Sequence, residues 1–258
     1  MKKSNTTYLK LLILPCLLSL LLPTFLSCSP SLAESEDIEV YEKETPRDDQ
    51  DEESYIDSFV FLGESTTSHL KNRGVLSGGK NTDKVWSTSS GTLCLDASID
   101  SVKLLVGDKE MTVFEGASAV RPRRIMLCFG LNGAKRNASG GGAYFKSCYK
   151  KLISTIKEAS PNTEIYIQSC YPIAENMDTS SYGCSPSELN TIIDTINSYA
   201  RELSGELGLV FVDTSPLLKN ERGMLRTEYQ AGDGYHLTAD AYVRVIEYIK
   251  TLAKEGKL

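Results

Sequence analysis

Short apolar runs alternate along the chain with longer segments in which apolar residues recur every three or four positions. Buried β-strands are typically about four to eight residues long and end at glycine or polar residues. Five runs fit this description, at 59–62, 84–88, 124–129, 164–168 and 209–213. Three segments have the apolar stripe of an amphipathic helix, at 144–159, 187–207 and 239–253. This alternation predicts a parallel sheet that is covered by helices on both faces.

The residues at the ends of the predicted helices indicate where they begin and stop. Ser187 is a favourable N-cap for the second helix, and Gly208 is a favourable C-terminal stop. Either Thr238 or Asp240 could cap the last helix. Residues 101–113 fit either a helix followed by a turn or a β-hairpin, and the pattern leaves both alternatives open.

Charge divides the 258 residues into three parts, although the net charge is only -6. Residues 1–33 carry three lysines and no acid, whereas residues 34–53 carry eleven acids against two basic side chains. Because the acidic part has almost no apolar periodicity, we expect 34–54 to be a disordered linker and 55–258 to be the folded domain. The remaining residues balance to zero charge and offer no broad basic face, so nucleic acid is not an expected partner.

Residues 1–33 resemble an export leader, with two lysines ahead of an apolar stretch at 11–22 that is short for a membrane span. Cleavage after Ala33 would release a soluble product, whereas the segment ending at Cys28 resembles a bacterial lipobox. We favour a lipid anchor at Cys28, because an acidic tether suits an anchored domain. An uncleaved anchor helix is the remaining alternative. The protein is thus expected to be exported, and to be extracellular or anchored to the outer face of a bacterial membrane.

Five of the seven cysteines fall within the predicted domain. They form no CxxC motif and no cluster with histidine, so no zinc site is expected. Cys170 and Cys184 bracket a polar loop and could form a disulfide in an oxidising compartment. The odd number leaves at least one thiol free or paired elsewhere.

Several polar residues follow the ends of predicted strands, where parallel α/β sheets bind ligands. Ser65 comes after the first strand at the start of a helix, where its N–H could donate to an oxyanion. Asn132 follows the third strand, and its amide could donate to the same oxyanion. Asp233 lies three residues before His236, one of two histidines, and could hold one ring nitrogen while the other acts as a base. Together these residues provide the parts of an acyl-transfer site.

The four motifs resemble, in order, those of SGNH hydrolases in the GDSL esterase superfamily. They are Phe-Leu-Gly-Glu-Ser-Thr-Thr at 61–67, Asn-Arg-Gly-Val-Leu-Ser-Gly at 72–78, Phe-Gly-Leu-Asn at 129–132 and Asp-Gly-Tyr-His-Leu-Thr at 233–238. The resemblance implies a nucleophile at Ser65, a base at His236 and an orienting carboxylate at Asp233. It also implies that the N–H groups of Ser65 and Gly78, with the Asn132 amide, stabilise the oxyanion. Gly79 is the alternative to Gly78.

The same resemblance implies a three-layer α/β/α sandwich with a flavodoxin-like parallel sheet of order 2-1-3-4-5. It implies a serine esterase that removes short acyl groups, above all O-acetyl groups on carbohydrate, without a metal or cofactor. The alternatives are transfer of acetyl to a glycan and a glycan-binding module without turnover. The sequence makes no prediction of oligomeric state.

Two residues depart from the family motifs. Glu64 replaces the usual aspartate beside the nucleophile, which lengthens that side chain by one methylene. Gly133 replaces an aspartate that often follows the third-motif asparagine and would orient it. The second histidine, His69, has no carboxylate partner in the motifs, so we expect it to be a pocket-wall or surface residue.

Overall fold

The computed structural model describes residues 52–258, with side chains from Tyr55 onward. The expected leader at 1–33, the lipidation site at Cys28 and the linker up to residue 51 lie outside the described residues. The first described helix is α1 (Glu52–Asp57), so the last three residues of the expected linker are helical. The folded domain therefore begins slightly earlier than the charge pattern predicts.

Five parallel strands form the central sheet, and all five predicted strands are confirmed. They are β1 (Phe59–Gly63), β2 (Val85–Trp86), β5 (Arg124–Cys128), β6 (Glu164–Gln168) and β7 (Val210–Val212). Their order across the sheet is β2-β1-β5-β6-β7, which is the expected 2-1-3-4-5 when the five are counted along the chain. Gly63 pairs with Cys128, so β1 and β5 end level and the segments that follow them leave from the same edge.

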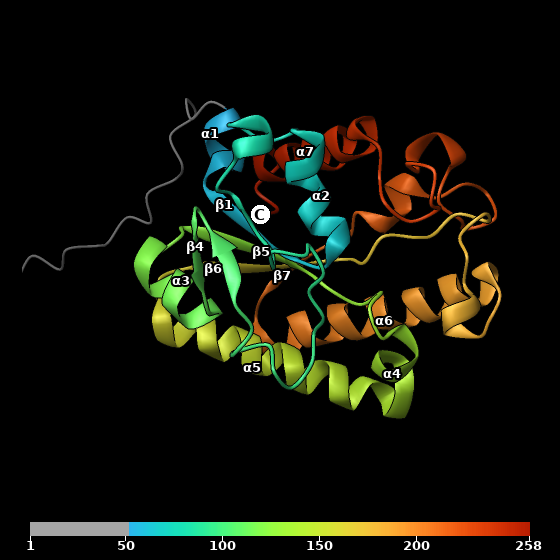
Figure 1. The fold of residues 1–258 in the computed structure, drawn as a ribbon, viewed down its shortest axis with the longest axis horizontal. Helices are drawn as coiled ribbons and strands as arrows, with labels where there is room; N and C mark the ends of the chain where they lie inside the picture. The colour runs from blue at the N-terminus through green and yellow to red at the C-terminus, as the bar shows by residue number, and fades with distance from the viewer. Residues whose placement is uncertain (1–51) are drawn as a thin grey trace, which may run out of the picture. The chain divides into compact units, whose positions relative to one another are not determined.

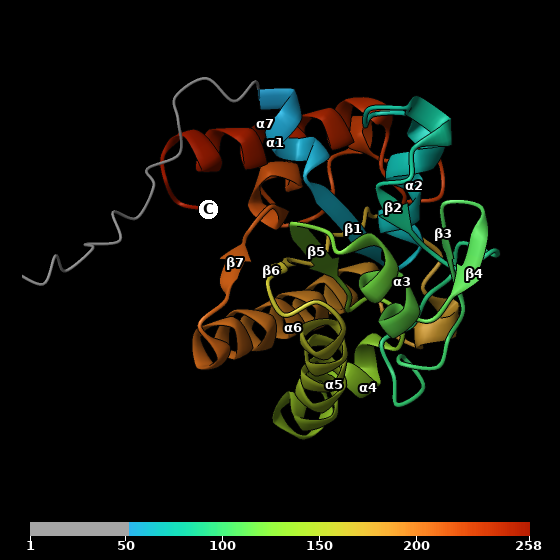
Figure 2. The same cartoon turned by 90° about the vertical axis from the view of Figure 1, so that its left-hand side faces the viewer.

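Helices cover both faces of the sheet (Figures 1 and 2). One layer contains α1, α2 (Ser65–Arg73) and α7 (Ala239–Lys254), and the other contains α3 (Val113–Val120), α4 (Ala134–Ala138), α5 (Ala143–Ala159) and α6 (Pro186–Leu207). Successive side chains of a strand point to opposite faces. Phe59 and Phe61 of β1 accordingly join the core beneath the first layer, whereas Val60 and Leu62 join the core beneath the second. The expected three-layer α/β/α sandwich is confirmed.

The segment that the sequence left undecided is a β-hairpin. Strands β3 (Leu104–Val106) and β4 (Lys109–Met111) are antiparallel, and Gly107 turns between them with φ of 61°. Helices α3 and α4 were not predicted, because eight and five residues are too short to show a helical stripe. Single 3-10 turns complete the connections, at Gly79–Asn81, Ser139–Gly142, Ser180–Tyr182, Ser215–Leu218 and Thr227–Tyr229.

Helix α6 begins one residue before its predicted start, and its N-cap lies two residues before the predicted cap. Its N-cap is Ser185, whose hydroxyl accepts the N–H of Glu188 while the Glu188 carboxylate accepts the N–H of Ser185. Pro186 occupies the first helical position, which suits its fixed φ, so the prediction of Ser187 as N-cap was wrong. Gly208 ends the helix in the left-handed conformation, as predicted. Thr238 caps α7, which decides between the two candidates there.

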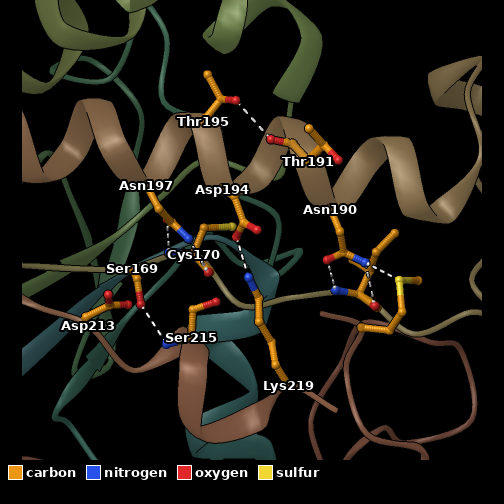
Figure 3. Close-up of polar contacts among 12 residues, drawn as sticks. Ser169, Cys170, Asn190, Thr191, Asp194, Thr195, Asn197, Asp213, Ser215 and Lys219 are labelled. Atoms are coloured by element: carbon orange, nitrogen blue, oxygen red, sulfur yellow. Dashed lines mark hydrogen bonds and ion pairs between the residues drawn. The ribbon is translucent and has the colours of Figure 1, made fainter. Parts of the chain in front are cut away.

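All five cysteines of the described residues are free, so the disulfide that the sequence allowed between Cys170 and Cys184 is not formed. Cys170 is buried beneath α6, and the side chain of Asn197 holds its backbone N–H at 2.7 Å and its carbonyl at 3.0 Å (Figure 3). Cys184 lies in the loop that leads into α6, where its carbonyl accepts a hydrogen bond from Thr179. Each cysteine is thus fixed by a different neighbour.

Candidate active site

A chain of hydrogen bonds joins Ser65, His236 and Asp233. The Ser65 Oγ atom lies 3.0 Å from Nε2 of His236, and Nδ1 of the same ring lies 2.7 Å from Oδ2 of Asp233. A carboxylate only accepts hydrogen bonds, so Nδ1 carries the proton and Nε2 is left to accept from the Ser65 hydroxyl. Ser65 opens α2 directly after β1, and His236 precedes α7. The fold therefore brings together three predicted site residues in the arrangement of a nucleophile, a base and an orienting carboxylate.

The Asp233 carboxylate also holds its own turn. Its Oδ1 atom accepts the backbone N–H groups of Tyr235 at 3.1 Å and of His236 at 3.0 Å. Burial acts to raise the pKa of Asp233, but the hydrogen bonds from His236 and Tyr235 outweigh it, and the pKa lies below its usual range. Gly234 has φ of 87°, and a Cβ there would lie 2.7 Å from the backbone of Met177. Glycine is thus required for the turn that sets the Asp233–His236 geometry.

Two long-range hydrogen bonds fix α2 against the segment that carries His236. Arg73, at the end of α2, donates from Nε to the carbonyl of Leu237 at 3.1 Å. The hydroxyl of Tyr242 on α7 donates to the carbonyl of Thr66, in the first turn of α2. Both ends of the helix are therefore tied to the chain around His236, which stabilises the distance between the serine and the imidazole.

Glu64 lies between Ser65 and the loop that follows β5. Its carboxylate accepts three backbone N–H groups, from Gly130 at 3.1 Å, Leu131 at 3.0 Å and Asn132 at 3.0 Å. The side chain is fully buried, and burial raises its pKa to about 7 although the three N–H groups act in the opposite direction. The longer side chain at this family position therefore still makes a complete set of hydrogen bonds, and it fixes the backbone of Asn132 beside Ser65.

The side chain of Asn132 is held from the loop after β2. Its Nδ2 atom donates to the carbonyl of Leu93 at 2.9 Å. An amide nitrogen has two hydrogens, so a second donor is left for a substrate oxygen. The carbonyls of the same loop are held by the fully buried Asn137, whose Nδ2 donates to Gly130 at 3.2 Å and to Asn132 at 3.1 Å. Asn137 is a structural partner of the site that the sequence did not indicate, because α4 was not predicted.

Gly133 has φ of 76°, a conformation that glycine adopts readily. An added Cβ would lie 2.8 Å from the guanidinium of Arg136. The aspartate expected at this position in the family would be strained here, and Glu64 and Asn137 hold the Asn132 backbone instead.

The structure does not bring Gly78 to the site. Gly78 follows the C-terminal end of α2 and precedes β2, and the nine residues of α2 carry the chain about 13 Å away from Ser65. Its neighbour Ser77 donates to Asp57, which lies just before β1 at the opposite edge of the sheet. The prediction of Gly78 as an oxyanion donor is therefore corrected, and the same topology rules out Gly79.

Gly91 is the glycine that lies beside the site. It follows β2, and its carbonyl accepts the hydroxyl of Ser68 at 3.3 Å, while the same hydroxyl lies 3.0 Å from the carbonyl of Ser65. Its own N–H donates to Thr88 within the turn. The signal for Gly91 was present in the sequence, because Ser-Gly follows the predicted strand at 84–88 on the carboxyl side.

The sequence profile of the GDSL-like Lipase/Acylhydrolase family matches residues 61–244. The chain belongs to this GDSL-like family. The match contains every residue of the hydrogen-bonded chain and both sides of the loop that Glu64 holds. No curated protein sequence matches the chain at a significant level.

Solved structures share the fold of this GDSL-like chain at low sequence identity. A candidate acylhydrolase from Bacteroides fragilis is 16% identical with a TM-score of 0.51, over 78% of this chain and 88% of that chain. A candidate platelet activating factor from Streptococcus pneumonia is 18% identical with a TM-score of 0.50, over 78% and 90%. A family two carbohydrate esterase from Clostridium thermocellum is 15% identical with a TM-score of 0.50, over 78% and 64%. At these identities the likeness shows a common fold.

In this GDSL-like site, His69 is partly buried, as a residue of the pocket wall would be. Its ring stacks on the ring of His236 with centroids 3.7 Å apart. No signal in the sequence indicated this contact, since the two histidines are far apart in the chain and have no common motif.

The carboxyl ends of β6 and β7 are joined to one another instead of to Ser65. The hydroxyl of Ser169 accepts the backbone N–H of Thr214 at 2.9 Å, and that of Ser215 at 2.9 Å, which Figure 3 shows. Lys219 and Asp194 form an ion pair beside them. These strand ends therefore stabilise the sheet edge.

Within residues 52–258, no cluster of histidine, cysteine and acidic side chains could hold a metal ion, and no helix is long and apolar enough to cross a membrane.

Proposed function

We propose that this protein is a serine ester hydrolase in which Ser65 is the nucleophile, His236 the general base and Asp233 the residue that orients the base. The observation that carries the proposal is the unbroken hydrogen-bonded chain from Ser65 Oγ through the imidazole to Asp233. A serine hydroxyl is a weak nucleophile at neutral pH and needs an adjacent base, which Nε2 of His236 supplies. Membership in a family of lipases and acylhydrolases supports the same reaction type.

The reaction follows from these positions. Ser65 Oγ attacks the acyl carbon and passes its proton to Nε2 of His236, which forms an imidazolium ion beside the Asp233 carboxylate. The imidazolium then protonates the departing alkoxide, and the acyl group stays on Ser65. Water attacks this ester, with His236 again accepting the proton, and releases the carboxylic acid.

We assign two donors to the oxyanion. Ser65 is the first residue of α2, so its backbone N–H has no carbonyl partner within the helix. The remaining hydrogen of the Asn132 amide is the second donor. Removal of one such donor typically costs about 10²–10³ in kcat. Glu64 supports both, because it precedes Ser65 and binds the Asn132 backbone.

Short acyl esters are the proposed substrates, with O-acetyl groups on carbohydrate first among them. Ser68, in the first turn of α2, and Gly91, whose carbonyl accepts the Ser68 hydroxyl, are both small residues, which suits a small acyl group. The shared fold with a carbohydrate esterase makes acetylated carbohydrate the natural first panel to test.

Hydrolysis of p-nitrophenyl acetate by the purified protein tests this proposal. Ser65→Ala should abolish turnover, whereas Ser187→Ala, an exposed serine on α6, should leave it unchanged. Equal activity in wild type and Ser65→Ala would exclude Ser65 as the nucleophile. A panel of acetylated glycans, scored for released acetate, then defines the substrate. Acetyl found on a second sugar would favour an acetyltransferase, and binding without turnover would favour a glycan-binding module.

A further inference from the structure

His69 and His236 stack face to face although they come from different elements. Their ring centroids are 3.7 Å apart and their planes differ by 11°. His69 lies on α2, one helical turn after Ser65, so a single short helix presents both the serine and the stacked ring to His236. The ester hydrolysis described above assigns no role to His69.

The surroundings of His69 keep its ring uncharged. Its Nδ1 atom is buried and has no hydrogen-bond partner among the described residues. Burial lowers the pKa of His69 to about 4, and Arg73, together with His236 whenever it is protonated, acts in the same direction, against the carboxylate of Asp233. Tyr235 also faces the pair, with its ring centroid 4.0 Å from that of His236. At neutral pH the stacked ring is therefore a neutral aromatic face.

The hydrogen bonds of His236 lie in the plane of its ring. They leave from Nδ1 to Asp233 and from Nε2 to Ser65, and the ring is joined to the backbone through Cβ, so only small out-of-plane tilts remain. A flat ring packed in parallel against the face limits these tilts, whereas Tyr235 is tilted by 39°. A neutral aromatic face also attracts the positive charge that His236 acquires when it takes the serine proton.

We infer that His69 is a positioning residue of this enzyme, a neutral ring that fixes the plane of His236 and stabilises its imidazolium form. The inference rests on the proposed function, because it requires that His236 takes up a proton during turnover. It predicts that an uncharged aromatic ring at position 69 is sufficient to support turnover. A polar side chain of similar length should not support it.

Three variants of the full-length protein test the inference. His69→Phe should keep most of the wild-type kcat, because it preserves the flat neutral ring. His69→Gln and His69→Ala should lower kcat by about tenfold while KM changes little, because the substrate contacts stay and the imidazolium loses its support. Asn72→Ala, an exposed position on the same helix, should behave as wild type. The rate at which diisopropyl fluorophosphate labels Ser65 should follow the same order without any acyl substrate.

The comparison of Phe with Gln decides the outcome even if His69→Ala does not fold. If His69→Gln and His69→Phe have the same kcat and the same labelling rate, whether both are active or both impaired, the inference is overturned. The esterase proposal would remain intact. A wild-type protein that neither hydrolyses short esters nor reacts with the fluorophosphate would remove the proposed function itself, and the inference with it.

Discussion

The carboxylate of Glu64 accepts the backbone N–H of Asn132 at 3.0 Å, which connects the residue before Ser65, the proposed nucleophile, to the proposed oxyanion donor. The two residues are 68 positions apart in sequence and meet because β1 and β5 are neighbours that end level. Gly130 and Leu131 donate to the same buried carboxylate. Through this single side chain, the positions of Ser65 and of Asn132 are determined together.

The buried Glu64 carboxyl should give the protein a distinct pH-dependent stability. Burial raises its pKa from 4.5 to about 7, so between these values the folded protein keeps a proton that the unfolded chain releases. The free energy of unfolding should therefore fall as pH rises through this window, by about 3 kcal/mol from this group. Glu64→Gln, which does not titrate, should show a flatter slope in urea unfolding between pH 5 and pH 8. Glu110→Gln, at an exposed position, should keep the wild-type slope. Parallel slopes in wild type and Glu64→Gln would contradict the raised pKa.

Asp233→Asn should remove activity without unfolding the protein. The remaining oxygen can still accept the N–H groups of Tyr235 and His236, but the new amide cannot accept from Nδ1. The imidazole would then carry its proton on Nε2 and could not accept from Ser65, so kcat should fall by about 10³–10⁴-fold. Steady-state kinetics with a thermal melt measure both effects. Asp240→Asn, exposed in the first turn of α7, should keep wild-type kcat. More than a tenth of the activity in Asp233→Asn would argue against the assigned tautomer.

Substitution of two glycines should show which of them lies at the active site: Gly78, as the sequence predicted, or Gly91, as the structure indicates. Gly78→Ala strains a residue with φ of 77°, so it should cost about 1 kcal/mol of stability and leave kcat/KM unchanged. Gly91→Ala strains a residue with φ of 71° and places a Cβ 3.2 Å from Ser68 Oγ, which contacts the Ser65 carbonyl. Its kcat/KM should fall at least tenfold, by about as much as loss of accurate nucleophile placement costs. The reverse pattern would restore Gly78 to the site.

Two serines at the start of α6 give a direct test of its observed boundary. Ser185→Ala removes the N-cap hydroxyl and should lower the free energy of unfolding by about 1 kcal/mol. Ser187→Ala, two residues later on the exposed side, should change it by less than about 0.5 kcal/mol. Urea unfolding of the two variants measures the difference. A larger loss in Ser187→Ala would support the boundary predicted from sequence.

The lipid anchor proposed at Cys28, which lies outside the described residues, can be tested in cells. Lipidated wild-type protein should partition into detergent, and Cys28→Ala should shift it to the aqueous phase. Cys16→Ala, a change in the same leader, should leave the partition as in wild type. A soluble wild-type product that begins at Glu34, identified by mass analysis of its N-terminus, would instead establish cleavage after Ala33.

The sequence by itself determined the sheet, its strand order through the family motifs, and the three residues of the hydrogen-bonded chain. Strand patterns are local, because burial on both faces demands a continuous apolar run such as Phe59–Gly63. The pairing of Asp233 with His236 could be predicted for a related reason. The two residues are three positions apart on one tight turn, so local geometry alone brings their side chains into contact. Helix ends were less certain, because Ser185 and Ser187 are both good caps and Pro186 decided between them.

Only the tertiary structure decided which distant groups meet at the site. A glycine signals a permissive backbone but not the sheet edge on which it lies, so Gly78 and Gly91 could be distinguished only once α2 and β2 were placed. The three N–H groups on Glu64 and the stacking of His69 on His236 each join residues from separate elements. Such contacts arise where separate elements pack together at the carboxyl ends of the strands, so no local pattern of residues predicts them.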